Sequence, residues 1–171
     1  MENLQHTHTI NKDETVISIK GLYKSFDELD VLKGVNLDVF KGENVAVLGK
    51  SGSGKSVLIK IIVGLLRPDK GEVIVLGKEV DKLAGKELDD LRLRIGFSFQ
   101  SSALYDSMNV YQNLAFPLTM NVKNLTKKQV DVAVAEALEA VGLANKSNEM
   151  PADLSGGQRK RIGIARTLIL K

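Results

Sequence analysis

The chain has 171 residues and a formal net charge of +3, with 43% hydrophobic and 26% charged residues. This composition is typical of a globular protein, and the length suffices for one domain with a sizeable core. The net charge is too small to indicate a nucleic-acid partner, and none is expected. The sequence contains no cysteine, which excludes disulfides, thiol catalysis and thiolate metal sites.

Residues 1–14 are polar and are expected to form a flexible tail ahead of a domain over 15–171. His6 and His8 lie in this tail, and two ligands are too few for a metal site. The tail has no hydrophobic segment like that of a secretory signal, and no apolar run approaches the ~18 residues of a membrane span. We therefore expect a cytoplasmic protein that reaches a membrane only through a partner.

Hydrophobic and polar residues alternate in the next part of the chain, which predicts strands. The apolar run over 45–48 predicts a strand buried on both faces. Pro68 and Gly71 predict that the helix after this run ends in a turn. The other elements expected here are strands over 16–26, 35–39, 73–76 and 95–99 and a charged helix over 83–94.

The later part of the chain is expected to be helical. Pro117 should limit the first helix, and Thr126 begins a four-residue capping box. Apolar residues three and four positions apart then predict an amphipathic helix that ends at Gly142. A helical subdomain over about 101–157 is therefore expected within an α/β core. The expected helices cover 109–120, 130–141 and the residues from Gly156 to the end of the chain.

A phosphate-binding loop follows the apolar run. Gly49 and the triplet Gly54-Lys55-Ser56 match the motif G-x-x-x-x-G-K-[ST]. Glycines let such a loop curl, so that its backbone N–H groups and the start of the next helix face phosphate oxygens. Lys55 supplies a charge for the β- and γ-phosphates, and the Ser56 hydroxyl is a ligand for Mg²⁺. The sequence therefore predicts binding of a nucleoside triphosphate.

Three further features accompany this loop. Gln100 ends the apolar run GFSFQ, Leu154 begins the pentapeptide LSGGQ, and Tyr23 lies in a strand ahead of the loop. Together these features resemble the ATP-binding subunit of an ABC transporter, and the resemblance covers residues 16–171. It implies a P-loop NTPase core of the α/β class, with an antiparallel N-terminal β part, an inserted helical subdomain, and ATP and Mg²⁺ as cofactors.

The resemblance also implies roles for single residues. Tyr23 is expected to stack on adenine, with a half-buried strand tyrosine as the alternative. Lys55 and Gln100 are the expected catalytic residues, and Ser56 and Gln100 the expected Mg²⁺ ligands. The LSGGQ signature is expected to meet the γ-phosphate of ATP held by a second copy of the chain. The implied ATP-binding positions are Tyr23, Gly49, Lys50, Ser51, Gly52, Ser53, Gly54, Lys55, Ser56, Val57, Ser155, Gly156, Gly157 and Gln158.

Segments 49–60 and 99–118 and the basic residues 159–161 are similar to those of ATPases of Mla-type lipid transporters. This similarity implies two partners, a membrane permease and an MCE-type lipid-binding subunit. It also implies phospholipid or another hydrophobic lipid as cargo, and a position on the inner face of the cell membrane. Residues near 100–118 would then meet the permease.

The chain departs from the family pattern after the signature. A family member continues into a strand ending in an Asp-Glu pair, followed by a switch histidine, and none of these is found here. The Walker B aspartate and the catalytic glutamate are therefore expected in a longer protein of which this chain is a fragment. A protein that ends at Lys171 is expected to show no ATPase activity.

Several functions remain open from the sequence. The protein is expected to be the ATPase of a lipid-transporting ABC system. Another ABC importer or exporter, or a soluble ABC protein acting on ribosomes or DNA, is the alternative. An ATP-binding module that regulates a partner without hydrolysis is a third possibility.

Overall fold

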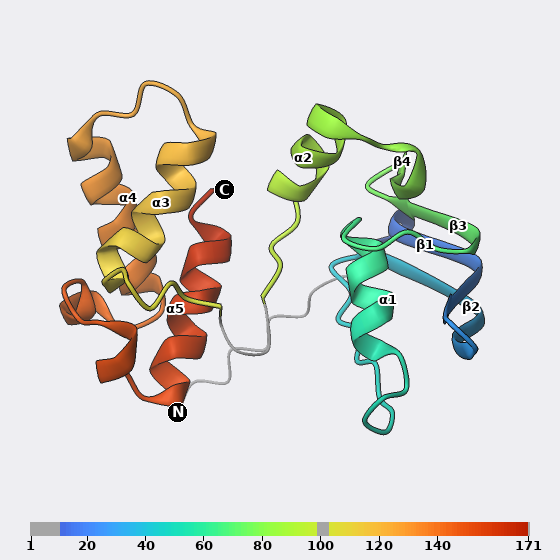
Figure 1. The fold of residues 1–171 in the computed structure, drawn as a ribbon. Coiled ribbons are helices and arrows are strands. Elements are labelled where there is room, and N and C mark those ends of the chain that lie inside the picture. Colours follow the sequence, from blue (N-terminus) through green and yellow to red (C-terminus); the bar gives the residue numbers. More distant parts are fainter. Residues whose placement is uncertain (1–10, 99–102, 171) are drawn as a thin grey trace, which may run out of the picture. The chain divides into compact units, whose positions relative to one another are not determined.

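The computed structural model describes residues 11–98 and 103–170. The chain divides into two compact units, Met1–Arg92 and Leu93–Lys171 (Figure 1), and each is described by itself below. No helix in the described ranges combines the length and the hydropathy that a membrane span requires.

The first unit is built on a four-stranded antiparallel sheet. β1 (Asn11–Phe26) and β2 (Leu29–Lys41) form a long hairpin, and β3 (Lys70–Val75) pairs with the other edge of β1. The short β4 (Lys78–Glu79) pairs with β3, which gives the strand order β2-β1-β3-β4 (Figure 1).

The strands expected over 16–26, 35–39 and 73–76 coincide with parts of β1, β2 and β3, and these predictions are confirmed. β1 begins earlier than expected, inside the stretch interpreted as a tail, because Asn11 already pairs with Lys41 at the end of β2. β1 and β3 approach closely at two glycines. Gly71 has a φ of +99°, and a Cβ atom there would collide with the carbonyl group of Gly21.

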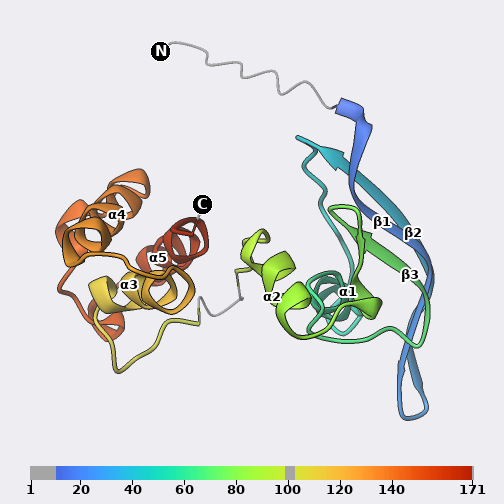
Figure 2. The ribbon, with the colours of Figure 1, turned by 90° about the horizontal axis from the view of Figure 1, so that it is seen from above.

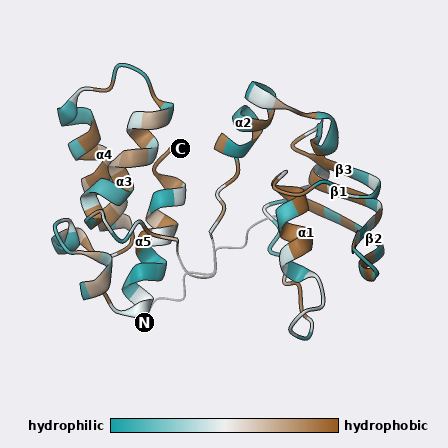
Figure 3. Ribbon diagram, viewed as in Figure 1, coloured by the Kyte–Doolittle hydropathy of each residue, from teal (hydrophilic) through white to brown (hydrophobic). Residues whose placement is uncertain are grey.

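α1 (Lys55–Ile62) lies against one face of this sheet (Figure 2) and buries Leu58 and Ile61. The chain turns after α1 at Gly64, so the helix ends before the turn expected at Pro68. The charged helix expected over 83–94 is confirmed as α2 (Gly85–Leu93). The hydropathy colouring in Figure 3 shows α1 as mostly hydrophobic and α2 as mostly hydrophilic.

Arg92 joins these two helices. Its Nη2 donates a hydrogen bond to the carbonyl oxygen of Gly64 at 2.7 Å, and its Nε donates to that of Val63 at 3.3 Å. The last carbonyl groups of a helix have no partner within the helix and favour a cation. Arg92 therefore caps the end of α1.

The structure contradicts the strand expected over 45–48. These residues form no strand, and Val45, Val47 and Leu48 are 43%, 41% and 90% exposed. A strand buried on both faces needs neighbours on both edges to bond its backbone groups. No strand within residues 11–98 and 103–170 pairs with this segment. The strand expected over 95–99 is also absent from 95–98, and Phe99 lies outside the described residues.

The second unit is helical. It contains α3 (Val110–Asn121), α4 (Lys127–Ala140) and α5 (Gly156–Leu168), with two short 3-10 turns between α4 and α5 (Figure 1). A buried aliphatic core lies between the three helices. Its fully buried members include Val110, Leu114, Val134, Leu138, Ile162 and Ala165.

Pro117 lies inside α3 and does not limit it as expected. A proline within a helix removes one backbone hydrogen bond. The last turn is nevertheless held, because Asn121 Nδ2 donates to the carbonyl oxygen of Pro117 at 2.8 Å and Val122 N donates to that of Leu118 at 2.9 Å.

All three helices begin with a reciprocal capping box. In each box the side chain of the N-cap residue accepts a hydrogen bond from the backbone N–H of the third helical residue. The side chain of that third residue accepts one from the backbone N–H of the N-cap residue. The box expected at Thr126 is confirmed, and the starts of α3 and α5 use the same device. The three pairs are Asn109 with Gln112, Thr126 with Gln129, and Ser155 with Gln158.

Candidate functional site

The loop ahead of α1 is closed around the ammonium group of Lys55. Nζ donates hydrogen bonds to the carbonyl oxygens of Gly49 and Lys50, both at 2.7 Å, and lies 3.4 Å from Ser53 Oγ. All three acceptors are neutral. A phosphate oxygen would offer the same ammonium a negatively charged acceptor, which adds the attraction of opposite charges to the hydrogen bond.

Two glycines give this loop its shape. Gly54 has a φ of +89°, and a Cβ atom there would lie 2.8 Å from Val31 Cγ1 on β2. Gly49 faces the inside of the loop, where a Cβ atom would lie 2.6 Å from Ser53 Oγ. A side chain at either position would fill the space that a phosphate requires or push the loop away from the sheet.

The start of α1 is open to an anion. Gly54 is its N-cap and contributes no side-chain hydrogen bond, and the first turn contains no acidic residue. Its first N–H groups therefore have no capping acceptor, and the helix dipole favours negative charge there. Ser51 and Gly52 are exposed beside this helix start, and Val57 is half-buried behind it. The loop and the helix start together fit a phosphate chain.

The described residues supply one candidate Mg²⁺ ligand. The side chain of Ser56 is exposed in the first turn of α1, where a hydroxyl would adjoin a bound phosphate. Mg²⁺ is commonly held by one or two protein oxygens together with substrate phosphates and water, so this donor set fits it. Gln100, the other expected ligand, lies outside the described residues. Within the described ranges no three acidic, histidine or cysteine side chains form a metal cluster.

Tyr23 lies on β1 and is 46% exposed. A Cβ atom at Gly34 would lie 2.9 Å from the Tyr23 hydroxyl, so the ring extends over β2. The next residue, Lys24, pairs with Leu32 of β2. Leu32 lies beside the phosphate loop, because a Cβ atom at Gly54 would be 3.0 Å from Leu32 Cδ2. Consecutive strand residues point to opposite faces of a sheet and paired residues share a face. Lys24 is therefore on the face nearer the phosphate loop.

Phe26, which the sequence reasoning did not select, lies at the end of β1 and is 42% exposed. The Lys24 ammonium lies 5.4 Å from the centroid of its ring, within cation–π distance. Lys24 in turn forms an ion pair with Asp69 at 2.6 Å. Phe26 and Lys24 thus share the face that lies nearer the phosphate loop. Side chains alternate between the two faces along a strand, so residues 24 and 26 share one face and Tyr23 lies on the other. This alternation could have indicated Phe26 as a candidate from the sequence alone.

The LSGGQ pentapeptide forms the start of α5. Ser155 is the N-cap, its Oγ accepts from Gln158 N at 3.2 Å, and Gln158 Oε1 accepts from Ser155 N at 2.8 Å. Gly156 and Gly157 are exposed, and a Cβ atom at Gly157 would meet nothing within 4 Å. The first turn contains no acidic residue. Open backbone N–H groups and a positive dipole end therefore leave this helix start accessible to an anion.

Two basic residues that follow the pentapeptide have structural contacts. The Nη1 atom of Arg159 donates to the carbonyl oxygens of Leu154 and Pro151. The Nη1 atom of Arg161 donates to that of Val141 at 3.0 Å, at the C-terminal end of α4. These two guanidinium groups therefore cap backbone carbonyl groups within the second unit.

The structure therefore gathers the expected site residues into two groups. Residues 49–57, together with Tyr23, lie in the first unit, and residues 155–158 lie in the second. Each group includes a helix start with no acidic residue in its first turn, which suits phosphate.

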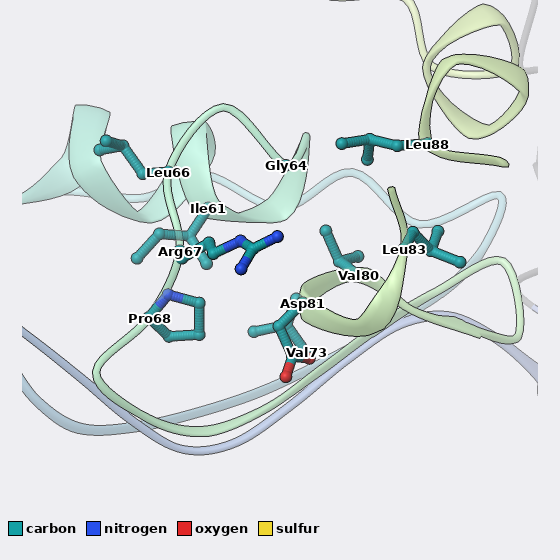
Figure 4. A pocket seen from close by; sticks show the side chains of 10 residues that line it. All are labelled: Ile61, Gly64, Leu66, Arg67, Pro68, Val73, Val80, Asp81, Leu83 and Leu88. Atoms are coloured by element: carbon teal, nitrogen blue, oxygen red, sulfur yellow. The ribbon is translucent and has the colours of Figure 1, made fainter. Parts of the chain in front are cut away.

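A separate small cavity lies behind α1 (Figure 4). Its volume is about 30 Å³, which is room for about one water molecule. Arg67 and Asp81 are its charged lining residues, and Asp81 Oδ1 is buried without a hydrogen-bond partner in the described part of the chain. This cavity is too small for a nucleotide, and it does not include the phosphate loop.

Known proteins are similar to this chain over most of its length. A family model described as ABC transporter matches residues 32–171. The protein TRIGALACTOSYLDIACYLGLYCEROL 3, chloroplastic, of Arabidopsis thaliana is 45% identical over 159 residues, which make up 93% of this chain and 46% of that protein. The "Probable ribonucleotide transport ATP-binding protein mkl" of Mycobacterium leprae (strain TN) is 43% identical over 154 residues, 90% of this chain and 44% of that protein. The chain thus spans less than half the length of these relatives.

A solved structure gives the same answer for the fold. The ATP-binding cassette MJ0796, in a dimeric post-hydrolysis state bound to ADP and Pi, matches with a TM-score of 0.81 and 33% identity, over 90% of this chain and 69% of that one. This likeness confirms the expected α/β fold class, a P-loop core with an antiparallel N-terminal sheet and added helices. The chain belongs to the ABC transporter family.

Proposed function

We propose that this chain is part of an ATP-binding and ATP-hydrolysing subunit that drives an ABC transporter. The observation that carries the proposal is the Lys55 ammonium, held inside the loop by two carbonyl oxygens at 2.7 Å beside an open helix start. Phosphate oxygens from ATP would replace those neutral acceptors with negatively charged ones. Ser56 would hold Mg²⁺ on the same phosphates, and Gln100 is proposed to assist the metal and the attacking water.

The adenine end of the nucleotide has two candidate partners. Tyr23 is the residue expected from the family resemblance. Phe26 is supported by its exposure, by its position on the face nearer Gly54, and by the cation above its ring. We infer that Phe26 is the stronger candidate, because a stacking ring must share a face with the phosphate loop.

The second group of site residues requires a second copy of the chain. We propose that Ser155–Gly157 and Gln158 meet the γ-phosphate of ATP bound to the P-loop of another copy, in a two-fold dimer. The open N-terminus of α5 supports this role, as does the dimeric state of the matched cassette. Lys55 and the signature would then act on one phosphate from opposite sides.

Hydrophobic lipid is the proposed cargo, with a membrane permease and an MCE-type lipid-binding subunit as partners. The resemblance to Mla-type ATPases and the lipid in the printed name of the plant relative support this choice. The mycobacterial relative is named for ribonucleotide transport, so a different cargo is the second candidate. The protein would bind the inner face of the cell membrane through its permease.

Two experiments test these proposals. The first compares ATP binding and phosphate release by residues 1–171 and by the full-length protein, both with Mg²⁺. We expect hydrolysis only from the full-length protein, because the aspartate and glutamate of the family pattern are expected after the signature and are not found within residues 1–171. Failure of the full-length protein to bind ATP would refute the proposed function.

The second experiment concerns the cargo. The full-length protein is purified from its own cells, and the membrane proteins that accompany it are identified. Recovery of a permease together with a lipid-binding subunit supports lipid transport. Recovery of a sugar or amino-acid permease alone would refute the lipid assignment and leave the ATPase assignment intact.

A further inference from the structure

α5 is joined to the loop that precedes α3 by one side chain. Arg166 lies in the last turn of α5, and its Nη1 donates a hydrogen bond to the carbonyl oxygen of Ala103 at 2.7 Å. The centre of the same guanidinium lies 6.0 Å from the centroid of the Tyr105 ring. Arginine binds through a planar fork and a charged face at once, so this residue fixes both the backbone and the aromatic side chain of the loop.

Tyr105 of this loop and two residues of α3 form an exposed surface, which we call the Tyr105 platform. It consists of Tyr105, Phe116 and Met120, which are 47%, 36% and 68% exposed. The rings of Tyr105 and Phe116 meet edge to face, with centroids 5.4 Å apart. Exposed aromatic and methionine side chains that lie together are typical of a protein-binding surface.

A buried amide holds the other side of this loop. Asn113 on α3 is fully buried, and its Oδ1 accepts from Tyr105 N at 2.8 Å. Its Nδ2 donates to the carbonyl oxygens of Tyr105 at 3.1 Å and Met108 at 2.9 Å. The loop is thus fixed to α3 by Asn113 and to α5 by Arg166. A displacement of α5 relative to α3 must therefore strain or move the loop.

The two ends of α5 have different contacts. Ser155 caps the end proposed to meet a nucleotide, and Arg166 lies about 16 Å further along the helix at 1.5 Å per residue. Ile162 and Ala165 are fully buried between them, so the helix is packed along its length and moves as one body.

We propose that Arg166 is a positioning residue that couples the nucleotide-facing start of α5 to the Tyr105 platform. This inference rests on the proposed function, because it takes the start of α5 as a nucleotide contact. Nucleotide bound at the signature would shift α5, and Arg166 would carry that shift to the surface proposed to meet a permease. The coupling is reciprocal, so a partner bound at the platform would change the affinity for nucleotide.

The test places a reporter on the platform of the full-length protein. Tyr105→Trp keeps an aromatic ring under the guanidinium, and this chain has no other tryptophan. Emission is recorded with and without Mg²⁺ and a non-hydrolysable ATP analogue, and the signal of the protein with Tyr105 intact is subtracted. The reporter is combined with Arg166→Met, with Arg166→Gln, and with Arg161→Met as the matched control. Arg161 is an arginine of the same helix that also donates to a backbone carbonyl, but at the end of α4.

We expect the analogue to change Trp emission in the reporter protein and in the Arg161→Met control. Both Arg166 variants should lose that change, while calorimetry shows an analogue affinity within about threefold of the parent. Helical circular dichroism checks folding. If Arg166→Met does not fold, Arg166→Gln alone shows whether the emission change depends on Arg166. A change that persists without Arg166, or a reporter that binds the analogue with no change, would overturn the coupling. A reporter that does not bind the analogue at all would instead overturn the proposed function.

Discussion

The Nζ atom of Lys24 lies 2.6 Å from Asp69 Oδ1 and ties the end of β1 to the turn that leads into β3. Asp69 Oδ2 also accepts from Ser25 N at 2.6 Å, and Asp69 N donates to the carbonyl oxygen of Tyr23 at 3.0 Å. The same Lys24 ammonium lies over the ring of Phe26. Asp69 therefore orients the cation that faces the candidate adenine partner.

Asp69→Asn is expected to lower the melting temperature at neutral pH, and this difference from the parent protein should disappear in acid. The hydrogen bond from Lys24, followed by that from Ser25 N–H, holds the pKa of Asp69 below its ordinary value of 3.8. Because the folded pKa is lowered, the contribution of the carboxylate is complete above about pH 4 and is lost as the pH falls through the folded pKa. Thermal melts of the parent and the variant at about pH 7 and about pH 2 measure this.

The control for that experiment is Asp38→Asn, which changes an exposed acid of β2 that has no ion pair within the described ranges. It should change the melting temperature little at either pH. A difference between parent and Asp69→Asn that is equal at both pH values would contradict the ion-pair explanation.

Lys55→Ala in the full-length protein should weaken ATP binding at least about tenfold, or about 1.4 kcal/mol. The ammonium that now binds two carbonyl oxygens is the charge that the loop itself directs at phosphate. Lys60→Ala is the matched control, since it removes an exposed lysine at the other end of the same helix. Calorimetric titration with ATP and Mg²⁺ distinguishes the two variants. Equal affinities for parent and Lys55→Ala would exclude this residue as the phosphate partner.

Ser155→Arg should leave ATP binding by single subunits nearly intact but abolish ATP-dependent dimerisation and turnover. The reason is steric and electrostatic, because a long cation would occupy the open start of α5. Thr126→Arg is the control: it breaks the same kind of capping box on α4, which has no proposed nucleotide contact. Size-exclusion chromatography with ATP and a phosphate-release assay provide the readouts. Normal turnover by Ser155→Arg would refute the two-sided site.

Phe26→Ala and Tyr23→Ala should separate the two candidates for adenine stacking. Loss of a stacking ring costs on the order of 1 kcal/mol, which is about fivefold in affinity. That loss should appear for ATP but not for inorganic tripolyphosphate, which has no base. We expect Phe26→Ala to show the selective loss and Tyr23→Ala to bind both ligands nearly as the parent does. The reverse result would restore Tyr23 as the adenine partner.

Local signals in the sequence predicted the local structure well. The capping box at Thr126 needs only residues three positions apart, and the helix begins there as expected. Part of the phosphate loop has the same character, because Gly49 lies beside Ser53 and Lys55 donates to Gly49 and Lys50. Such features are visible in sequence because their partners are neighbours in the chain.

The strand expected over 45–48 shows the limit of this reasoning. An apolar run indicates that a segment suits a buried strand. The neighbouring strands that would bond its backbone groups must come from elsewhere in the chain. No such partner exists within the described residues, and Leu48 is 90% exposed. Phe26 was missed for a related reason. It is a candidate adenine partner only if it lies on the face of the hairpin near Gly54, and the pairing of Lys24 with Leu32 is needed to identify that face.

The three capping boxes of the second unit use only amide and hydroxyl groups, none of which gains or loses a proton in ordinary buffers. The first unit instead contains five of the six ion pairs among the described residues, including Lys24–Asp69. Acid protonates Asp69, whose pKa the hydrogen bond from Lys24 lowers, and leaves the neutral caps intact. Acidification should therefore weaken the contact between the end of β1 and the turn before β3, while the three helices of the second unit keep their capping boxes.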